Sequence, residues 1–300
     1  MKNIFQKRRG GIPLTKGDII FDCVNYAFML LVTMVFVFPL LFVISTSLMS
    51  QTTYLKYGYS FFPREIDFTA YQMVLDDSFG FASAFRDTII VTVVGTTLNL
   101  LFTAGMGYGL AKKDLPYRNL ITGFVFFTML FSGGMIPTYM VVKGTGLLNT
   151  YWALILPGLV SPWNMFLMRN FFMAIPESLT ESASLDGANE IQILFRIVIP
   201  LSLPAMATMA LFYGVGHWNA WMPSLLYEPS RKINTLQYFL KTVLEGLTDD
   251  RKETIQDYLN VPTQQLKMAA LVVATAPMII IYPFIQKFFV KGLIVGSVKG

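Results

Sequence analysis

The sequence predicts an all-α integral membrane protein with six transmembrane helices, and three observations support that prediction. Of the 300 residues, 54% are hydrophobic and only 14% are charged, whereas soluble domains carry about 25% charged residues. The mean hydropathy is +0.54, and a water-soluble globule of this size lacks the interior to bury so much apolar surface. The apolar residues form long continuous runs, which favours helices over a β-barrel. The same low charge density argues against intrinsic disorder and against nucleic-acid binding, despite a net charge of +5.

Six stretches of bilayer length contain no Asp, Glu, Lys or Arg: 23–55, 88–111, 119–142, 144–168, 197–227 and 268–286. A helix needs about 20 apolar residues to cross the hydrocarbon core, so each run is sized for one crossing. The predicted helices are about 23–46, 85–111, 119–142, 147–172, 201–225 and 266–286. The first run is long and has no A-x-A site after it, so we expect an uncleaved helix rather than a signal peptide.

The basic residues between these runs predict the orientation. Even-numbered crossings place most of the net positive charge on the side that holds both ends of the chain. The positive-inside rule then puts both termini in the cytoplasm. The predicted chain begins with a cytoplasmic segment (1–22), continues as a membrane domain (23–287) and ends in a cytoplasmic tail (288–300). The membrane domain has two large outer loops, 47–84 and 226–265, and one cytoplasmic loop, 175–200.

Several kinds of chemistry are disfavoured by the residue inventory. The single cysteine, Cys23, excludes an internal disulfide and a Cys-based metal cluster, and the single histidine, His217, excludes a multi-histidine metal site. The acidic pairs at 76–77 and 249–250 are of the type found in metal-dependent glycosyltransferases, but both fall in predicted outer loops, away from cytoplasmic nucleotide-sugars. We therefore predict no catalytic residue, no metal and no cofactor on this chain.

The cytoplasmic loop 175–200 has the pattern of two short helices joined by a sharp turn. Ser178 and Glu181 have the spacing of a capping box, which predicts a helix over about 179–186. Gly187 follows at the position where glycine commonly ends a helix.

The residues after Gly187 predict a second helix. Asn189 and Gln192 form another capping pair, opening a helix toward Pro200. The first helix would expose the small side chains of residues 182–184. Small side chains let another surface approach closely, so this loop is one of two things. It is either a compact docking knob for a partner, or an ordinary loop at the membrane interface in which the glycine only turns the chain.

The loop resembles the EAA loop of ABC-importer permeases. The family pattern is E-A-A, three residues, G, nine residues and I-x-L-P, and this chain has Glu181, Gly187, Ile197 and Pro200 in register, with Ile199 where the leucine is usual. Ser182 stands where the first alanine is usual.

The flanking sequence is similar to the sugar-uptake (maltose permease-like) branch of the family, and in particular to its LplC-type subgroup. The matching segments are 169–172, 175–176, 186–188, 212–219 and 282–300. Ala220 departs from the pattern, because an acidic or polar residue is expected there.

The resemblance implies the type I ABC-importer permease fold and a multi-pass location in a bacterial cytoplasmic (inner) membrane. It implies a second homologous permease, two cytosolic ATPase subunits that bind ATP and Mg, and an extracytoplasmic solute-binding protein. The substrate implied is an oligosaccharide from an acidic polysaccharide such as alginate or pectin. The implied ATPase-coupling residues are Glu181, Ser182, Ala183, Ser184, Asp186, Gly187 and Ala188.

Polar and aromatic residues inside the predicted membrane helices are candidates for the substrate pathway. They are His217, Trp218, Asn219, Trp221 and Asn164. Aromatic rings stack on sugar faces and amides bind hydroxyls. Alternatively, His and Asn hydrogen-bond neighbouring helices and Trp marks the membrane interface.

An alternative function is a secondary sugar transporter driven by an ion gradient. Such carriers often bind the coupling ion with a charged residue inside the membrane. The six charge-free runs leave room for such a residue only near helix ends, and the EAA-like loop has no role in that mechanism. The sequence therefore favours the ATP-driven importer.

Overall fold

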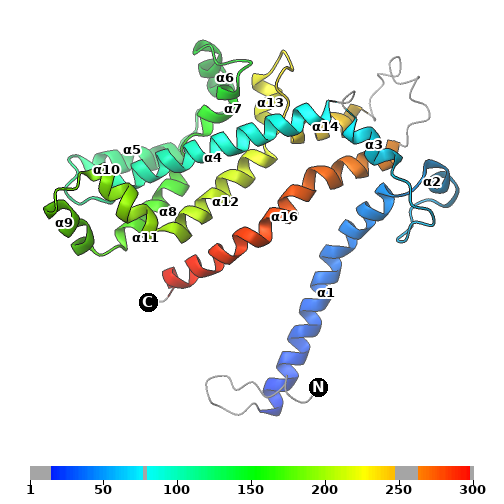
Figure 1. Cartoon of the computed structure of the whole chain (residues 1–300), viewed down its shortest axis with the longest axis horizontal. Coiled ribbons are helices and arrows are strands. Elements are labelled where there is room, and N and C mark those ends of the chain that lie inside the picture. Colours follow the sequence, from blue (N-terminus) through cyan, green and yellow to red (C-terminus); the bar gives the residue numbers. More distant parts are fainter. Residues whose placement is uncertain (1–14, 77–79, 247–262, 298–300) are drawn as a thin grey trace. The chain divides into compact units, whose positions relative to one another are not determined.

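The computed structural model describes residues 15–76, 80–246 and 263–297, and these residues form helices and no β-strand (Figure 1). This confirms the all-α prediction for that part of the chain. The chain divides into two compact units, residues 1–72 with 258–272 and residues 73–257 with 273–300. Three described helices are long and apolar enough to cross a membrane, or up to five if each of two bent pairs is one span.

In the first unit, α1 (Lys16–Ser47) is the longest element and begins earlier than the predicted residue 23. Thr15 and Asp18 form a capping box, in which each side chain bonds the other residue's backbone N–H. This box adds nearly two turns, residues 16–22, before the charge-free run. The apolar side chains of α1 are exposed along most of its length, as expected of a helix that faces lipid or another chain.

The end of α1 is fixed by its hydroxyl side chains. Ser45 donates to the carbonyl of Ser60 at 2.7 Å, and Ser47 lies 2.7 Å from the Tyr71 hydroxyl. Two short helices follow in the predicted outer loop, α2 (Gln51–Tyr57) and α3 (Thr69–Leu75). The predicted loop 47–84 is therefore partly helical.

The core of the second unit is α4 (Phe81–Ala111), which packs along α8 (Pro162–Met173) and α12 (Leu203–Asn219). Figure 1 shows α4 running beside both helices. Buried side chains from all three helices form one apolar cluster, which includes Ala104, Met168 and Met209. This interior burial, rather than an amphipathic surface, fixes the three helices together.

The range 119–142 does not form the single helix that was predicted. It contains α5 (Arg118–Leu130) and α6 (Met135–Gly144), whose axes differ by 115°. The break falls on Phe-Ser-Gly-Gly, and Gly134 has φ +88° and ψ −179°, a conformation open essentially to glycine alone. The pair is a broken span or a re-entrant loop.

The range 147–172 is also interrupted. It holds α7 (Tyr151–Ile155), the 3₁₀ turn η2 (Leu156–Gly158) and α8. Pro157 and Pro162 explain the breaks, because proline lacks the N–H that continues a helical ladder.

Before α12 lie α10 (Glu190–Ile193), the π-helical turn η3 (Leu194–Val198) and α11 (Ile199–Leu201). The chain bends by 87° between Leu201 and Leu203. After α12 come α13 (Met222–Tyr227) and α14 (Leu236–Gly246), so the predicted helix 201–225 is two helices that meet at Ala220 and Trp221.

The last helix, α16 (Thr263–Ser297), is longer than the predicted 266–286. The predicted tail 288–300 is therefore helical as far as Ser297. Several sequence features lie wholly or partly outside the described residues. They are residues 1–14, most of the outer loop after Gly246, and the acidic pairs 76–77 and 249–250.

Candidate functional site

The predicted coupling loop forms α9 (Glu177–Leu185), a turn at Gly187, and α10. The start of α9 corrects the sequence prediction, because Ser178 is not the cap. Pro176 is the N-cap residue, and its carbonyl accepts a hydrogen bond from the Leu179 N–H. Proline fixes an extended entry there, and Ser178 is already inside the helix.

The end of α9 confirms the prediction for Gly187. The residue has φ +86°, and a Cβ placed on it would meet nothing within 4 Å. The Ala188 N–H bonds the Ala183 carbonyl and the Gly187 N–H bonds the Ser184 carbonyl, both at 3.0 Å. These two bonds define a Schellman motif, which requires a left-handed residue at this position. The glycine is therefore needed for backbone conformation, not for space.

The exposed face of α9 differs in one residue from the predicted knob. Ser182 and Ser184 are exposed, but Ala183 and Ala188 pack against the buried cluster of α4, α8 and α12. Alanine therefore seats the helix on the protein. Within α9 the most exposed apolar side chain is Leu185, at 89% exposure, which is not among the predicted coupling residues.

The second half of the loop is anchored in the core. Asn189 and Gln192 form the predicted capping box, with bonds of 2.9 and 3.0 Å. Ile193 and Leu194 are buried in the same cluster as Tyr108 of α4. α10 and η3 are thus held on the packed interior by the buried Ile193, Leu194 and Val198, although Ile191 and Phe195 are exposed.

Two ion pairs tie this loop to the end of α4. Glu190 accepts a hydrogen bond from the Tyr108 hydroxyl at 2.6 Å and pairs with Lys112 Nζ at 2.8 Å. Lys113 Nζ pairs with Glu177 at 2.8 Å. Local sequence patterns could not predict these contacts, because Glu190 lies 82 and 78 residues from its two partners and Glu177 lies 64 residues from Lys113 along the chain. A cleft of about 710 Å³, lined by Glu177 and Glu181 among others, separates α9 from the end of α4.

Arginines stabilise the same end of α4. Arg118 Nε and Arg169 Nε both donate to the Leu110 carbonyl, at 2.9 and 3.0 Å. The last carbonyls of a helix carry partial negative charge and lack intrahelical donors, so two cations there are favourable. Residues from three elements therefore meet where α4 ends.

The predicted pathway residue His217 has a structural contact. Its Nε2 lies 2.7 Å from Asn99 Oδ1, and Asn99 Nδ2 donates to the carbonyls of Gly158 and Leu159 at 2.9 and 2.7 Å. Gly95 leaves room for the imidazole, since a Cβ there would lie 2.6 Å from Nε2. This network joins α4, α12 and the free carbonyls of η2, which corresponds to the interhelical alternative considered for His217.

Two of the five pathway candidates line a common cavity. Trp218 and Asn219 lie on a cavity of about 980 Å³ within the second unit, with walls from α4, α12, α14 and α16. Trp218 Nε1 donates to the Ala274 carbonyl at 3.3 Å, so the ring is fixed in place. Asn219 is exposed, and its Nδ2 bonds the Val215 carbonyl. His217, Trp221 and Asn164 do not line this cavity.

The remaining two candidates are placed elsewhere. Trp221 is half-buried, and Lys241 Nζ lies 4.6 Å from the centre of its ring, within cation–π range. Asn164 is buried in α8, and its backbone N–H bonds the Ser161 cap. The five residues do not form one site.

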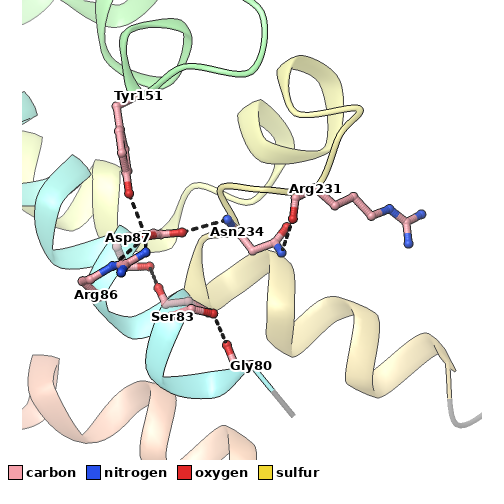
Figure 2. Close-up of polar contacts among 9 residues, drawn as sticks. Gly80, Ser83, Arg86, Asp87, Tyr151, Arg231 and Asn234 are labelled. Atoms are coloured by element: carbon pink, nitrogen blue, oxygen red, sulfur yellow. Dashed lines mark hydrogen bonds and ion pairs between the residues drawn. The ribbon is translucent and has the colours of Figure 1, made fainter. Parts of the chain in front are cut away.

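A second polar cluster surrounds Asp87 near the start of α4. Figure 2 shows Asp87 between Arg86, Tyr151 and Asn234. Its carboxylate, 1% exposed, accepts from the Tyr151 hydroxyl at 2.8 Å and the Asn234 N–H at 3.1 Å, and pairs with Arg86 at 3.1 Å. These bonds fasten α4 to α7 and to the segment before α14.

Glu228, close to this cluster, is also buried. Its side chain is 2% exposed. Burial raises the pKa of Glu228 to about 7, the negative charge of Asp87 adds to the rise, and the backbone N–H of Ile233 opposes it. The group is therefore partly protonated near neutral pH.

Long apolar helices beside a large open cavity, together with an exposed short helix seated on the core, are consistent with a membrane transport permease. The chain is 43% identical to the protein LplC of Bacillus subtilis (strain 168) over 288 residues, 95% of this chain and 97% of LplC. It is 41% identical to the polygalacturonan/rhamnogalacturonan transport system permease protein YtcP of the same organism over 284 residues, 94% of this chain and 99% of YtcP.

A solved structure is similar over nearly the whole chain. It is the crystal structure of a bacterial ABC transporter involved in the import of the acidic polysaccharide alginate, with a TM-score of 0.83 and 32% identity over 92% of this chain and 99% of that chain. No family model matches the sequence. The chain belongs to the family of ABC sugar-transport permeases, as the resemblance of its loop had implied.

Proposed function

We propose that this chain is one of two transmembrane subunits of an ATP-driven, binding-protein-dependent importer of oligosaccharides. It forms half of the translocation pathway with a second, homologous permease. Two cytosolic ATPase subunits carry the ATP and Mg, and this chain catalyses no reaction. An extracytoplasmic solute-binding protein delivers the oligosaccharide.

The proposed topology has six crossings of a bacterial cytoplasmic membrane with both termini in the cytoplasm. The bent pair α5–α6 and the segment α7–η2–α8 supply the third and fourth crossings in this topology. Broken helices at membrane depth are tolerated where neighbouring groups satisfy the freed backbone. The bonds from Asn99 to the Gly158 and Leu159 carbonyls support such an arrangement.

The observation that carries the proposal is the geometry of α9. A short helix with exposed serines and Leu185 lies in a loop whose other half is anchored in the core by Ile193, Leu194 and Val198. The Schellman turn at Gly187 fixes the angle between the two halves. We propose that α9 docks on the ATPase through Glu181, Ser182, Ser184, Asp186 and Gly187, with Ala183 and Ala188 seating it from below.

The proposed substrate is an oligosaccharide derived from an acidic polysaccharide. Support comes from the names of similar proteins, a polygalacturonan/rhamnogalacturonan permease and an alginate importer. The cavity that Trp218 and Asn219 line is large enough for several sugar rings, and it is the proposed pathway wall of this subunit.

Co-purification from the native membrane tests the proposal. The tagged chain is extracted in mild detergent, and its partners are identified by mass spectrometry against a control tag on an unrelated membrane protein. We expect an ATPase and a second permease in amounts comparable with the tagged chain. A chain recovered repeatedly without any ATPase would contradict the proposal and support the ion-gradient-driven secondary transporter.

A further inference from the structure

Glu190 has an unusual position between the projecting helix and the core. It lies three residues after Gly187, at the first position of α10. Its two carboxylate oxygens have different partners, both from the end of α4. Tyr108 donates to Oε2 at 2.6 Å and Lys112 Nζ to Oε1 at 2.8 Å. A carboxylate held by two donors has one preferred orientation, so it fixes the beginning of α10 against α4.

Apolar packing beside these Glu190 contacts holds α10 against the end of α4. The Glu190, Tyr108 and Lys112 contact is called the α10–α4 joint below. Tyr108 is buried in the cluster that also contains Ile193 and Leu194 of the loop and Phe172 of α8. The Tyr108 and Phe172 rings meet edge to face with centroids 6.4 Å apart. The hydrogen bonds of Glu190 lie at the polar edge of this cluster and join α10 to α4. A displacement of α10 therefore also displaces the end of α4.

Helix α4 connects this joint with the cavity. The same helix lines the 980 Å³ cavity through Ile89, Thr92, Val93 and Thr96, several turns before Tyr108. A rigid helix that contacts both places can carry displacement between them when it has two discrete arrangements that both places bias. The structure thus holds a physical connection from α9 through Glu190 and α4 to the cavity wall.

We propose that Glu190, with Tyr108 and Lys112, is a positioning residue that transmits movement of the docked α9 to α4. This proposal rests on the proposed function. Glu190 itself contacts neither the ATPase nor the sugar in this proposal. Its role is to make α9, α10 and α4 move as one body, so that closure of the ATPases changes the cavity.

The second ion pair is a matched control within the chain. Lys113 and Glu177 also pair at 2.8 Å, and Glu177 is as exposed as Glu190, each at 62%. The pairs differ in the lysine, since Lys113 is 71% exposed and Lys112 is 28% exposed. They differ also in the Tyr108 hydroxyl, which donates to Glu190, whereas no third group among the described residues joins Lys113 and Glu177. Exposed pairs of this kind contribute little. Loss of this pair should leave coupling unchanged, although Glu177 is the first residue of α9 itself.

The experiment uses the complete importer in proteoliposomes and measures both oligosaccharide uptake and ATP hydrolysis. For Glu190→Ala we expect the uptake per ATP to fall at least about fivefold, at the low end of typical coupling between sites, while the ATPase still co-purifies. Tyr108→Phe should give a smaller loss of the same kind, and Glu177→Ala should stay within about twofold of the unsubstituted importer. Exchanging the charges in Glu190→Lys with Lys112→Glu should recover part of the loss.

Three results separate the possible failures. An unchanged ratio in Glu190→Ala, or an equal loss in Glu177→Ala, would overturn the positioning role. If Glu190→Ala does not assemble, Tyr108→Phe and Lys112→Gln carry the same comparison, and unchanged ratios in both would overturn it equally. An unsubstituted importer that takes up sugar without hydrolysing ATP would contradict the proposed function itself.

Discussion

Replacement of Gly187 tests whether the angle of α9 matters for coupling. Gly187 has φ +86° in the Schellman turn that joins α9 to α10. An L-residue in this left-handed conformation costs about 1–2 kcal/mol. A Cβ meets nothing within 4 Å, so the cost arises from backbone strain alone. A penalty of this size lowers the population of the native turn by about 5–30-fold relative to alternative turns.

The nature of this penalty predicts an order among variants. Gly187→Asn should be the mildest, because asparagine tolerates the left-handed region better than other residues. Gly187→Ala should be intermediate, and Gly187→Val the most severe, because a β-branched residue is strongly disfavoured there. The assay is the fraction of ATPase that co-purifies with each variant, together with uptake per ATP in proteoliposomes.

Two outcomes would refute this reasoning. Equal and normal ATPase binding and coupling in all three variants would show that the left-handed turn is not needed. An order that follows side-chain size, with Asn worse than Ala, would show that Gly187 is required for close approach of a partner rather than for its φ. Gly105→Ala, at a position with φ in the ordinary range and open space around it, is the control substitution.

Three further predictions concern the rest of the second unit. Because the pKa of Glu228 is raised to about 7, its burial lowers the free energy of unfolding as pH rises from about 4.5 to 7, by about 3 kcal/mol in all. Glu228→Gln should flatten that part of a thermal-melting profile, and an unaltered profile would contradict the assignment. Gly95→Ala should clash with His217 and lower stability by about 1–3 kcal/mol, measured as a lower melting temperature than Gly105→Ala. Asn219→Ala should slow oligosaccharide uptake without releasing the ATPase, and normal uptake rates with several sugars would remove Asn219 from the pathway.

Composition and run length predicted the main helices because burial in lipid requires long uncharged segments. The start of α1 was missed, since Thr15 and Asp18 lie outside the apolar run and act only through local hydrogen bonds. The breaks at 131–134 and 156–162 were also missed. Glycine and proline are common in membrane helices, and whether they bend the chain depends on which neighbours satisfy the freed backbone groups.

The candidate site shows the same division between local and distant signals. Gly187 and the Asn189–Gln192 capping box were predicted correctly, because their bonds join residues at most five apart. The roles of Ala183 and Glu190 were not, because they depend on packing against α4, far away in sequence. His217 illustrates a third case, in which the sequence offered two explanations and the contact with Asn99 supplies a structural one.

The most direct test of the central claim is uptake of oligosaccharide by the assembled transporter in proteoliposomes. The complex is reconstituted with ATP enclosed or absent, with and without the solute-binding protein, and with and without a proton or sodium gradient. We expect uptake only when ATP and the binding protein are both present, and no effect when the ion gradient is dissipated. Uptake that follows the ion gradient and continues without ATP would contradict an ATP-driven permease.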